Sequence, residues 1–316
     1  MLESASFEGH LTSHANPLTL AQVAELERQG FLVIDTPQIG KSEIEWCRGI
    51  LMRLIQRGTG RKDGRSFDIA AREGGDGRVS LGLFRPSLYS SELSGWSFRN
   101  IGLQIARQLL GPDTTLAADN TVFKPKRVGG PTPWHQDEAY NDPLHYERQV
   151  TIWIAMSDTT VENGAMAFIP GSHLLGILPH RLHGGREEAN AIECCSGFDP
   201  ATQKVCPIPV GGMTIHLGST LHGASFNTSD SDRLGYILNY KTPPLPRPEL
   251  GEFAWNAKVA RAIQGRRRRW LLGGGIFIEV LRFIFADRDN KRFFFKRLRR
   301  RLAAKQRADG EHDSIE

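Results

Sequence analysis

The stretch PTPWHQDEAYNDP, residues 131–143, places a histidine, one spacer residue and an aspartate between prolines. On a β-strand, residues i and i+2 point to the same side, so His135 and Asp137 can direct an imidazole and a carboxylate toward one point. The same pair is also compatible with two polar residues at an exposed strand edge. A metal site built on this pair therefore requires a third ligand from elsewhere in the chain.

Residues 211–240, GGMTIHLGSTLHGASFNTSDSDRLGYILNY, offer His216 and His222 as that third ligand. A site with two histidines and one carboxylate leaves positions open on iron(II) for a co-substrate and dioxygen. Arg233 follows His222 by eleven positions, a distance that suits a strand, a turn and a return strand. Because arginine binds carboxylates through two parallel hydrogen bonds, this arrangement fits a small dicarboxylate co-substrate that chelates the metal at its other end.

The region around these residues, from about 115 to 242, predicts a β-rich core. Short runs of β-type residues alternate with turn signals there, and closely spaced short strands are typical of an antiparallel sandwich or barrel. The runs are DNTVFKP, PWHQD, QVTIWIAM, AMAFIPG, KVCPIPV, GMTIHLG, TLHGASF and RLGYILNY.

The N-terminal part predicts helices outside this core. Apolar periodicity indicates helices over 18–30, 42–56 and 96–110, with Thr19 as a cap of the first and Gly30 at its end. Residues 58–77 are rich in Gly, Arg and Asp without periodicity, and are expected to form a loop that could cover a site. The fold class is thus expected to be mainly β with flanking helices (α+β).

The breaker TPPLPRP at 242–248 divides the chain into a domain over 1–248 and a basic helical C-terminal extension over 249–316 with a disordered end. Residues 261–307 carry a net charge of +13 although the whole chain carries only +5, so the remainder is acidic by about −8. An aromatic face opposite a basic one in this extension could pack on the core, form a homo-oligomer contact, or lie on an anionic membrane surface. Nucleic acid is not an expected partner, because no reading motif accompanies the charge.

The four cysteines form no C-x-x-C pair and no regular framework, which favours reduced thiols. The first residues, MLESASFEGH, do not resemble a secretory signal. A cytoplasmic location is therefore expected.

Four motifs in order carry a resemblance to a known family: WHQD (134–137), TIWIAM (151–156), NGAMAFIPGSH (163–173) and HGASFNTSDSDR (222–233). With them, the chain from roughly 18 to 240 resembles the phytanoyl-CoA dioxygenase family of iron(II)- and 2-oxoglutarate-dependent oxygenases. The resemblance implies a double-stranded β-helix, also called a jelly roll or cupin core, with helices packed outside.

Carried over position by position, the resemblance implies that His135, Asp137 and His222 are the catalytic iron ligands. It implies that Arg233 pairs with the distal carboxylate of 2-oxoglutarate. Some halogenating relatives have Ala or Gly in place of the metal-binding carboxylate, so the presence of Asp137 favours hydroxylation or another oxidation over halogenation.

The resemblance also places an indole, Trp153, beside the co-substrate, and Asn120 at a strand position that contacts it. Other polar residues keep two readings. His216 could contact substrate or be a hydrogen-bonded histidine of the pocket wall, and Lys124 could meet an anionic substrate or lie at a solvated edge. The segment 174–204, with several histidines, could cover the pocket.

The implied function is a dioxygenase that uses iron(II), 2-oxoglutarate and O2 to hydroxylate a C–H bond of a small metabolite, releasing succinate and CO2. The same cofactors could instead support desaturation, cyclisation or epimerisation. An alternative of a different class is a non-catalytic cupin-like binding protein that acts through its basic tail.

Overall fold

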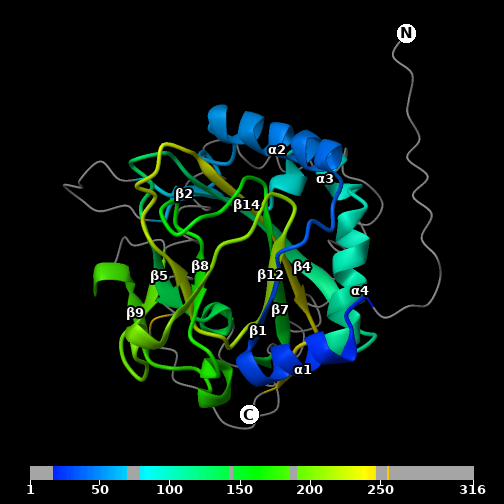
Figure 1. The fold of residues 1–316 in the computed structure, drawn as a ribbon, viewed down its shortest axis with the longest axis vertical. Helices are drawn as coiled ribbons and strands as arrows, with labels where there is room; N and C mark the ends of the chain where they lie inside the picture. Colours follow the sequence, from blue (N-terminus) through cyan, green and yellow to red (C-terminus); the bar gives the residue numbers. More distant parts are fainter. Residues whose placement is uncertain (1–16, 70–78, 142–144, 186–190, 247–254, 256–316) are drawn as a thin grey trace, which may run out of the picture.

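The computed structural model describes residues 17–69, 79–141, 145–185, 191–246 and 255. Over these residues the fold is α+β, with two large antiparallel sheets and with helices packed on one of them (Figure 1). The basic extension lies almost wholly outside this part of the chain, so its predicted helices and contacts stay predictions.

The larger sheet has seven strands, in the order β1 (Phe31–Ile34), β12 (Met213–Leu217), β7 (Gln149–Ala155), β14 (Arg233–Lys241), β4 (Thr115–Lys124), β3 (Leu81–Phe84) and β2 (Ser66–Asp68). The smaller sheet has four, in the order β11 (Lys204–Cys206), β8 (Met166–Phe168), β13 (His222–Ala224) and β5 (Thr132–His135). Two short pairs accompany them: β9 (His180–Leu182) with β10 (Ile192–Cys194), and β6 (His145–Tyr146) with β15 (Leu245–Pro246).

The central strands pass back and forth between the two sheets. Strands β4, β7, β12 and β14 belong to the larger sheet and β5, β8, β11 and β13 to the smaller. Successive members of this set change sheet except from β8 to β11, which pair with each other. This connectivity is consistent with the double-stranded β-helix expected from the sequence, and each of the eight β-type runs contributes to one of these strands.

The two sheets pack face to face through a small apolar cluster. Phe31 of β1 stacks on Phe168 of β8 with ring centroids 4.5 Å apart, and Trp153 and Ala224 belong to the same cluster. Apolar side chains therefore fill part of the space between the sheets, and polar side chains such as Thr151 and Asn239 face the rest of it.

Strand β7, whose sequence is QVTIWIA, has no exposed residue because both of its faces are covered. Ile152 and Ile154 point outward into the core beneath the helices, whereas Thr151 and Trp153 point inward between the sheets. The alternation with period two thus separates a helix-packing face from a polar inner face.

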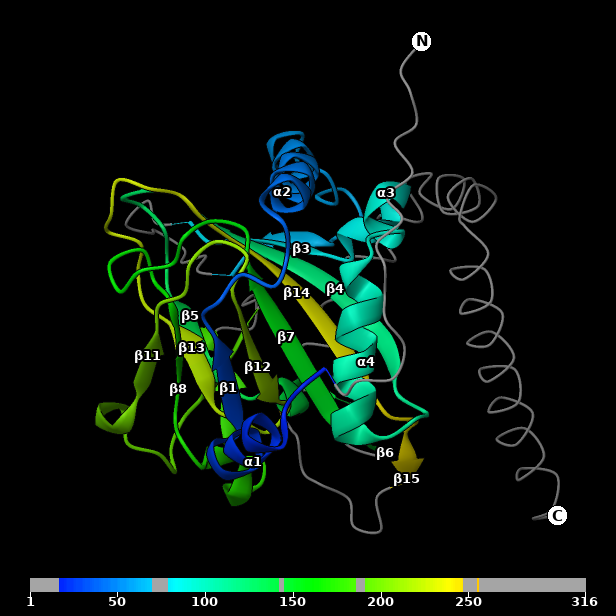
Figure 2. The same ribbon diagram turned by 45° about the vertical axis from the view of Figure 1, so that its right-hand side comes forward.

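The outer face of the larger sheet is covered by helices, and Figure 2 shows α4 running along β4 and β14. The helices are α1 (Leu20–Gln29), α2 (Lys41–Gln56), α3 (Ser91–Ser94) and α4 (Phe98–Leu110), and the 3-10 helices are Pro86–Leu88, Asp137–Tyr140, Ser172–Leu175, His183–Gly185 and Pro200–Thr202. Helix α4 approaches the sheet closely, because the Tyr240 hydroxyl donates to Arg99 O at 2.9 Å and a Cβ atom at Gly102 would overlap that hydroxyl.

The predicted helices over 18–30, 42–56 and 96–110 are confirmed within a few residues. Thr19 caps α1 and Gly30 ends it, as the sequence predicts. The structure adds that Thr19 forms a capping box with Gln22 and that Gly30 has the left-handed conformation. The expectation of no regular structure over 58–77 is wrong in its described part, because Ser66–Asp68 pairs with β3 at the sheet edge.

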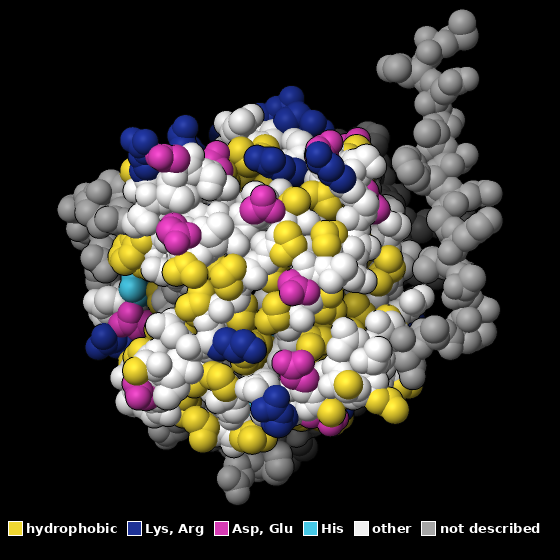
Figure 3. All heavy atoms as spheres, viewed as in Figure 1, with side chains coloured by type: hydrophobic (Ala, Val, Ile, Leu, Met, Phe, Trp, Pro, Cys, Tyr) yellow, Lys and Arg dark blue, Asp and Glu magenta, His cyan; other side chains and the backbone are white. Residues whose placement is uncertain are grey.

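Among the described residues, no helix is long and apolar enough to cross a membrane. The face in Figure 3 intersperses acidic and basic side chains, with Lys and Arg gathered at its upper end, where α2 lies. That face carries no broad surface of a single charge.

Candidate metal centre

His135 and His222 meet at the junction of two strands of the smaller sheet. His135 ends β5, His222 begins β13, and the two are direct partners in the antiparallel register. Their ring centroids are 4.2 Å apart. Two residues 87 positions apart in the chain are therefore placed side by side by strand pairing alone.

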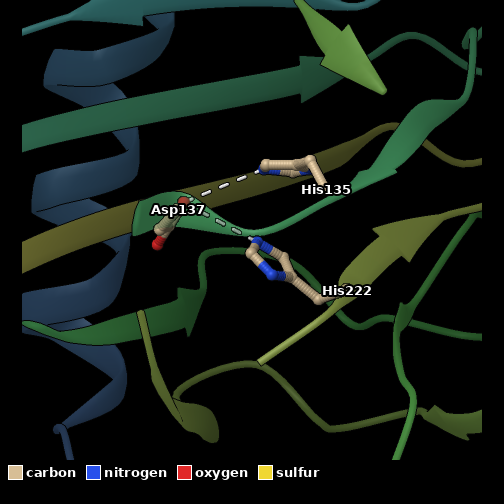
Figure 4. Close-up of side chains that lie close together, drawn as sticks. All are labelled: His135, Asp137 and His222. Atoms are coloured by element: carbon tan, nitrogen blue, oxygen red, sulfur yellow. Dashed lines mark ion pairs between the residues drawn. The ribbon is translucent and has the colours of Figure 1, made fainter. Parts of the chain in front are cut away.

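Asp137 joins them because Gln136 has extended backbone angles, φ −113° and ψ 131°. The aspartate Oδ1 lies 3.8 Å from Nε2 of His135 and 3.9 Å from Nε2 of His222 (Figure 4). One ligand atom from each of the three residues lies within 4.8 Å of the others. Nitrogen and carboxylate ligands at this separation surround a space suited to one divalent transition metal ion.

The outward-facing nitrogens fix the orientation of both rings. Nδ1 of His135 donates to Pro133 O at 2.8 Å, and Nδ1 of His222 donates to Thr220 O at 2.9 Å. Each histidine is thereby held with its proton on Nδ1, which leaves the Nε2 lone pair directed toward the other two residues.

The second carboxylate oxygen of Asp137 is already engaged. Its Oδ2 accepts from the Thr151 hydroxyl at 2.6 Å and from Nε2 of Gln149 at 3.1 Å. Nε2 of His216 lies 3.4 Å from the same oxygen. Because Oδ2 is occupied by protein contacts, Oδ1 is the oxygen available to a metal.

A row of amide and hydroxyl donors extends this contact across the larger sheet. Asn120 donates to Asn239 at 2.7 Å, Asn239 donates to Thr151 at 2.9 Å, and Thr151 donates to Asp137. Each group polarises the next in the direction of the carboxylate, and such chains strengthen their members. Asn120, expected to contact a co-substrate, lies on the same inner face, and its buried Oδ1 has no hydrogen-bond partner among the described residues.

Burial and charge set the protonation states that a metal requires. Burial lowers the pKa of His135, and burial with the neighbouring histidines lowers the pKa of His222 well below its ordinary value. Burial acts to raise the pKa of Asp137, but His216, His222 and His135 outweigh it and hold that pKa well below its usual range. The site therefore presents two neutral imidazoles and one carboxylate.

Arg233 begins β14 with its side chain on the inner face of the larger sheet. It is 1% exposed, and its Nε and Nη2 have no hydrogen-bond partner within the described structure. Its Cζ lies 4.6 Å from the ring centroid of Trp153. The indole has room because position 235 is glycine, where a Cβ atom would overlap it.

Arg233 and Asp137 are linked through one face of β7. Thr151 and Trp153 lie two positions apart on the same face of β7, a step of about 7 Å along a strand. Thr151 contacts Asp137 and Trp153 supports Arg233. Burial lowers the pKa of Arg233 to about 9. An unpaired buried guanidinium on the face of the sheet that also supports Asp137 fits one end of a dicarboxylate bound at its other end to the metal.

The described part of the segment 174–204, which is expected to cover the pocket, also supports the metal strand. His180 of the β9–β10 hairpin is 6% exposed, donates through Nδ1 to Leu178 O at 2.7 Å, and accepts from the backbone N–H of Gln136 at 3.2 Å. The Gln136 side chain is fully buried and donates to Gly176 O and Ser219 O. Gln136, which lies between the two ligands of the H-x-D pair, thus holds the metal strand against His180, Gly176 and Ser219.

The remaining predicted polar residues have these positions. His216 is buried against His222 and Asp137, and neither of its ring nitrogens has a hydrogen-bond partner among the described residues, so its predicted hydrogen bond is not found. His183, one of the histidines of the segment 174–204, pairs with Glu193 at 2.6 Å. Lys124 is fully buried, so the interpretation as a solvated edge is wrong.

Thr151, Gln149 and Asn239 were not predicted from the sequence. The signal was present for two of them: Gln149 and Thr151 precede Trp153 at steps of two on one strand, so all three share a face. No local pattern could show that this face meets Asp137, since the contact depends on how the two sheets pack.

The phytanoyl-CoA dioxygenase family matches residues 26–235, more than half of the chain. A probable alpha-ketoglutarate-dependent hypophosphite dioxygenase of Stutzerimonas stutzeri is 29% identical over 181 residues, 56% of this chain and 63% of that protein. Phytanoyl-CoA dioxygenase domain-containing protein 1 of Mus musculus is 33% identical over 189 residues, 53% of this chain and 61% of that protein. The chain spans less than two thirds of the length of these two relatives.

Among solved structures, EvdO2 from Micromonospora carbonacea var. aurantiaca is similar with a TM-score of 0.65 and 28% identity, over 75% of this chain and 96% of that chain. EvdO2 complexed with 2-oxoglutarate is similar with a TM-score of 0.63 and 25% identity. The similarity extends over nearly all of EvdO2, so the two chains share a fold.

Proposed function

The chain belongs to the phytanoyl-CoA dioxygenase family, and we propose that it is an iron(II)- and 2-oxoglutarate-dependent oxygenase. In this proposal it hydroxylates a C–H bond of a small metabolite and releases succinate and CO2. The observation that carries the proposal is the combination of the His135, Asp137 and His222 set with the unpaired, buried guanidinium of Arg233. A binding protein of the cupin type has no need of that guanidinium.

The residues present fit the metal and the co-substrate. His135, Asp137 and His222 would hold iron(II) through two nitrogens and one oxygen, and three protein ligands leave further positions open. The likeness to EvdO2, whose structure is known with 2-oxoglutarate, supports the choice of co-substrate. When bound, iron(II) with 2-oxoglutarate and O2 supplies the oxidant for an unreactive C–H bond.

The chain's own residues contribute order and charge to this chemistry. The Pro133 and Thr220 carbonyls hold the two imidazoles in one tautomer, and Thr151 keeps Asp137 from rotating. Arg233 would bind the distal carboxylate and fix the co-substrate at one end, with Trp153 beneath it. Asn120 would face the co-substrate with its free amide oxygen. Such fixed placement is the main contribution a protein makes to a cofactor reaction.

Turnover with defined products tests this proposal. The purified protein, supplied with iron(II) and 2-oxoglutarate, is screened against a panel of small metabolites for substrate-stimulated succinate release. Products are then analysed by mass spectrometry under isotopically labelled O2. Incorporation of one labelled oxygen supports hydroxylation, loss of two hydrogens shows desaturation or cyclisation, and an isomer of unchanged mass shows epimerisation.

The opposite result is equally defined. A protein that binds neither iron(II) nor 2-oxoglutarate would contradict the proposal and favour a non-catalytic binding protein. The matched control is His135→Ala, which removes one imidazole ligand and should abolish succinate release with every metabolite.

A further inference from the structure

Lys124 is a second buried cation beside Arg233. It ends β4, is fully buried, and is the direct register partner of Arg233 on β14. Directly opposite residues in an antiparallel pair lie on the same face with neighbouring Cβ atoms, so both cationic side chains enter the space between the sheets.

The Lys124 ammonium reaches across that space to the smaller sheet. Its Nζ donates to Ser225 O at 2.6 Å and to Ala224 O at 3.3 Å, at the end of the strand that begins with His222. An ammonium has three N–H donors, so these two bonds leave one donor for another acceptor.

Neither cation has a carboxylate partner in the described part of the chain. No acidic side chain there lies within 4.0 Å of Lys124 or Arg233, and no acid is among the causes of their pKa shifts. Burial, and then the charge of Arg233, lower the pKa of Lys124 well below its ordinary value. Two buried like charges destabilise each other unless an anion joins them. The pair therefore points to an anionic ligand rather than to an internal ion pair.

We propose that Lys124 is the second cation of the co-substrate pocket, supplying positive charge to the same distal carboxylate that Arg233 binds. This inference rests on the proposed function, because it takes the dicarboxylate from there. Lys124 is a binding and positioning residue in this scheme. Its hydrogen bonds also connect β13, which carries His222, to β4, which pairs with the strand of Arg233. One side chain thus links the metal end of the pocket to the carboxylate end.

Two keto acids separate a charge effect from a structural one. 2-Oxoglutarate and 2-oxopentanoate have the same chain length, but only the first carries a distal carboxylate. Their dissociation constants are measured anaerobically by titration calorimetry on the iron(II)-loaded full chain. Lys124→Met is expected to weaken 2-oxoglutarate binding about tenfold, as expected for one charge-assisted contact. It should leave 2-oxopentanoate binding nearly unchanged.

Two further variants complete the design. Lys124→Arg keeps the charge and should restore most of the preference for 2-oxoglutarate. Lys126→Met removes a solvent-exposed lysine two residues further on and should change neither constant. Thermal unfolding of each variant reports folding separately, and Lys124→Gln, which keeps amide donors for the two carbonyls, replaces Lys124→Met if the latter does not fold.

The outcomes are distinct. A reduced preference for the dicarboxylate in Lys124→Met, recovered in Lys124→Arg, supports the inference. Equal weakening of both keto acids, or a lower melting temperature with unchanged preference, overturns it and leaves Lys124 a structural residue. If the unsubstituted protein binds neither keto acid, the proposed function itself fails.

Discussion

The Thr151 hydroxyl donates a 2.6 Å hydrogen bond to Oδ2 of Asp137, across the interface between the two sheets. This contact holds the carboxylate with Oδ1 toward His135 and His222. Outer partners of metal ligands are worth about 10–100-fold in metal affinity. We therefore expect Thr151→Val, which keeps the shape but loses the donor, to weaken iron(II) binding by about that factor.

The measurement is an anaerobic competition between the protein and a chelator for iron(II). Thr151→Ser retains the hydroxyl and should bind nearly as well as the unsubstituted protein. Thr159→Val, which removes another buried hydroxyl that donates to Ile208 O, serves as the control for general destabilisation. Unchanged metal affinity in Thr151→Val would show that Asp137 needs no such support.

Arg233 should govern co-substrate binding without governing metal binding. Arg233→Ala is expected to weaken 2-oxoglutarate binding by about 2–5 kcal/mol, because a charge-assisted contact is lost inside the protein. Iron(II) affinity should stay the same, since Arg233 contacts none of the three ligands. Arg127→Ala, at an exposed arginine that pairs with Asp230, is the control. Normal 2-oxoglutarate affinity in Arg233→Ala would remove Arg233 from its role.

Gly235 provides the space in which Trp153 supports Arg233. A Cβ atom at that position would overlap the indole, so Gly235→Ala should cost about 1–3 kcal/mol of unfolding free energy and also weaken 2-oxoglutarate binding. Gly49→Ala lies in the middle of α2 with only an ordinary contact, and should be neutral or slightly stabilising. Chemical denaturation of both variants checks the difference in sign, and equal stabilities would contradict the packing account.

The stability of the metal-free protein should depend on His180 below neutral pH. The unfolded chain binds a proton at this residue near pH 6.5, whereas burial lowers its pKa in the folded protein to about 4. Protons therefore favour the unfolded chain in that window, and stability falls as pH decreases from about 6.5 to 4. His180→Gln should show a flatter decline over the same range in denaturant titrations. Parallel curves for the two proteins would show that His180 titrates normally.

Much of the fold was predictable because its signals are local. The β-branched and aromatic residues of QVTIWIAM and the cap residues Thr19 and Gly30 indicate a strand and a helix from local signals alone. The H-x-D pair predicted that His135 and Asp137 would meet, because their spacing depends on one strand. The spacing of His222 to Arg233 does not form a hairpin of paired strands, because β13 and β14 lie in different sheets.

The remainder depended on non-local packing. Lys124 carries the sequence signal of a surface lysine, and only the pairing of β4 with β14 and its bonds to the end of β13 explain its burial. His180 contacts Gln136 across 44 positions of chain, through a hairpin whose place over β5 no periodicity reveals. The strand at Ser66–Asp68 is only three residues long and follows a glycine-rich stretch, so the sequence showed no strand pattern there.

The central claim is that His135, Asp137 and His222 hold iron(II) in a form that accepts 2-oxoglutarate. The most direct measurement is anaerobic visible absorption of the protein with iron(II), before and after addition of 2-oxoglutarate. We predict a weak charge-transfer band that appears only with both components and is absent in His135→Ala, while Lys126→Met retains it. A band of unchanged intensity in His135→Ala, or no band in the unsubstituted protein, would contradict the account.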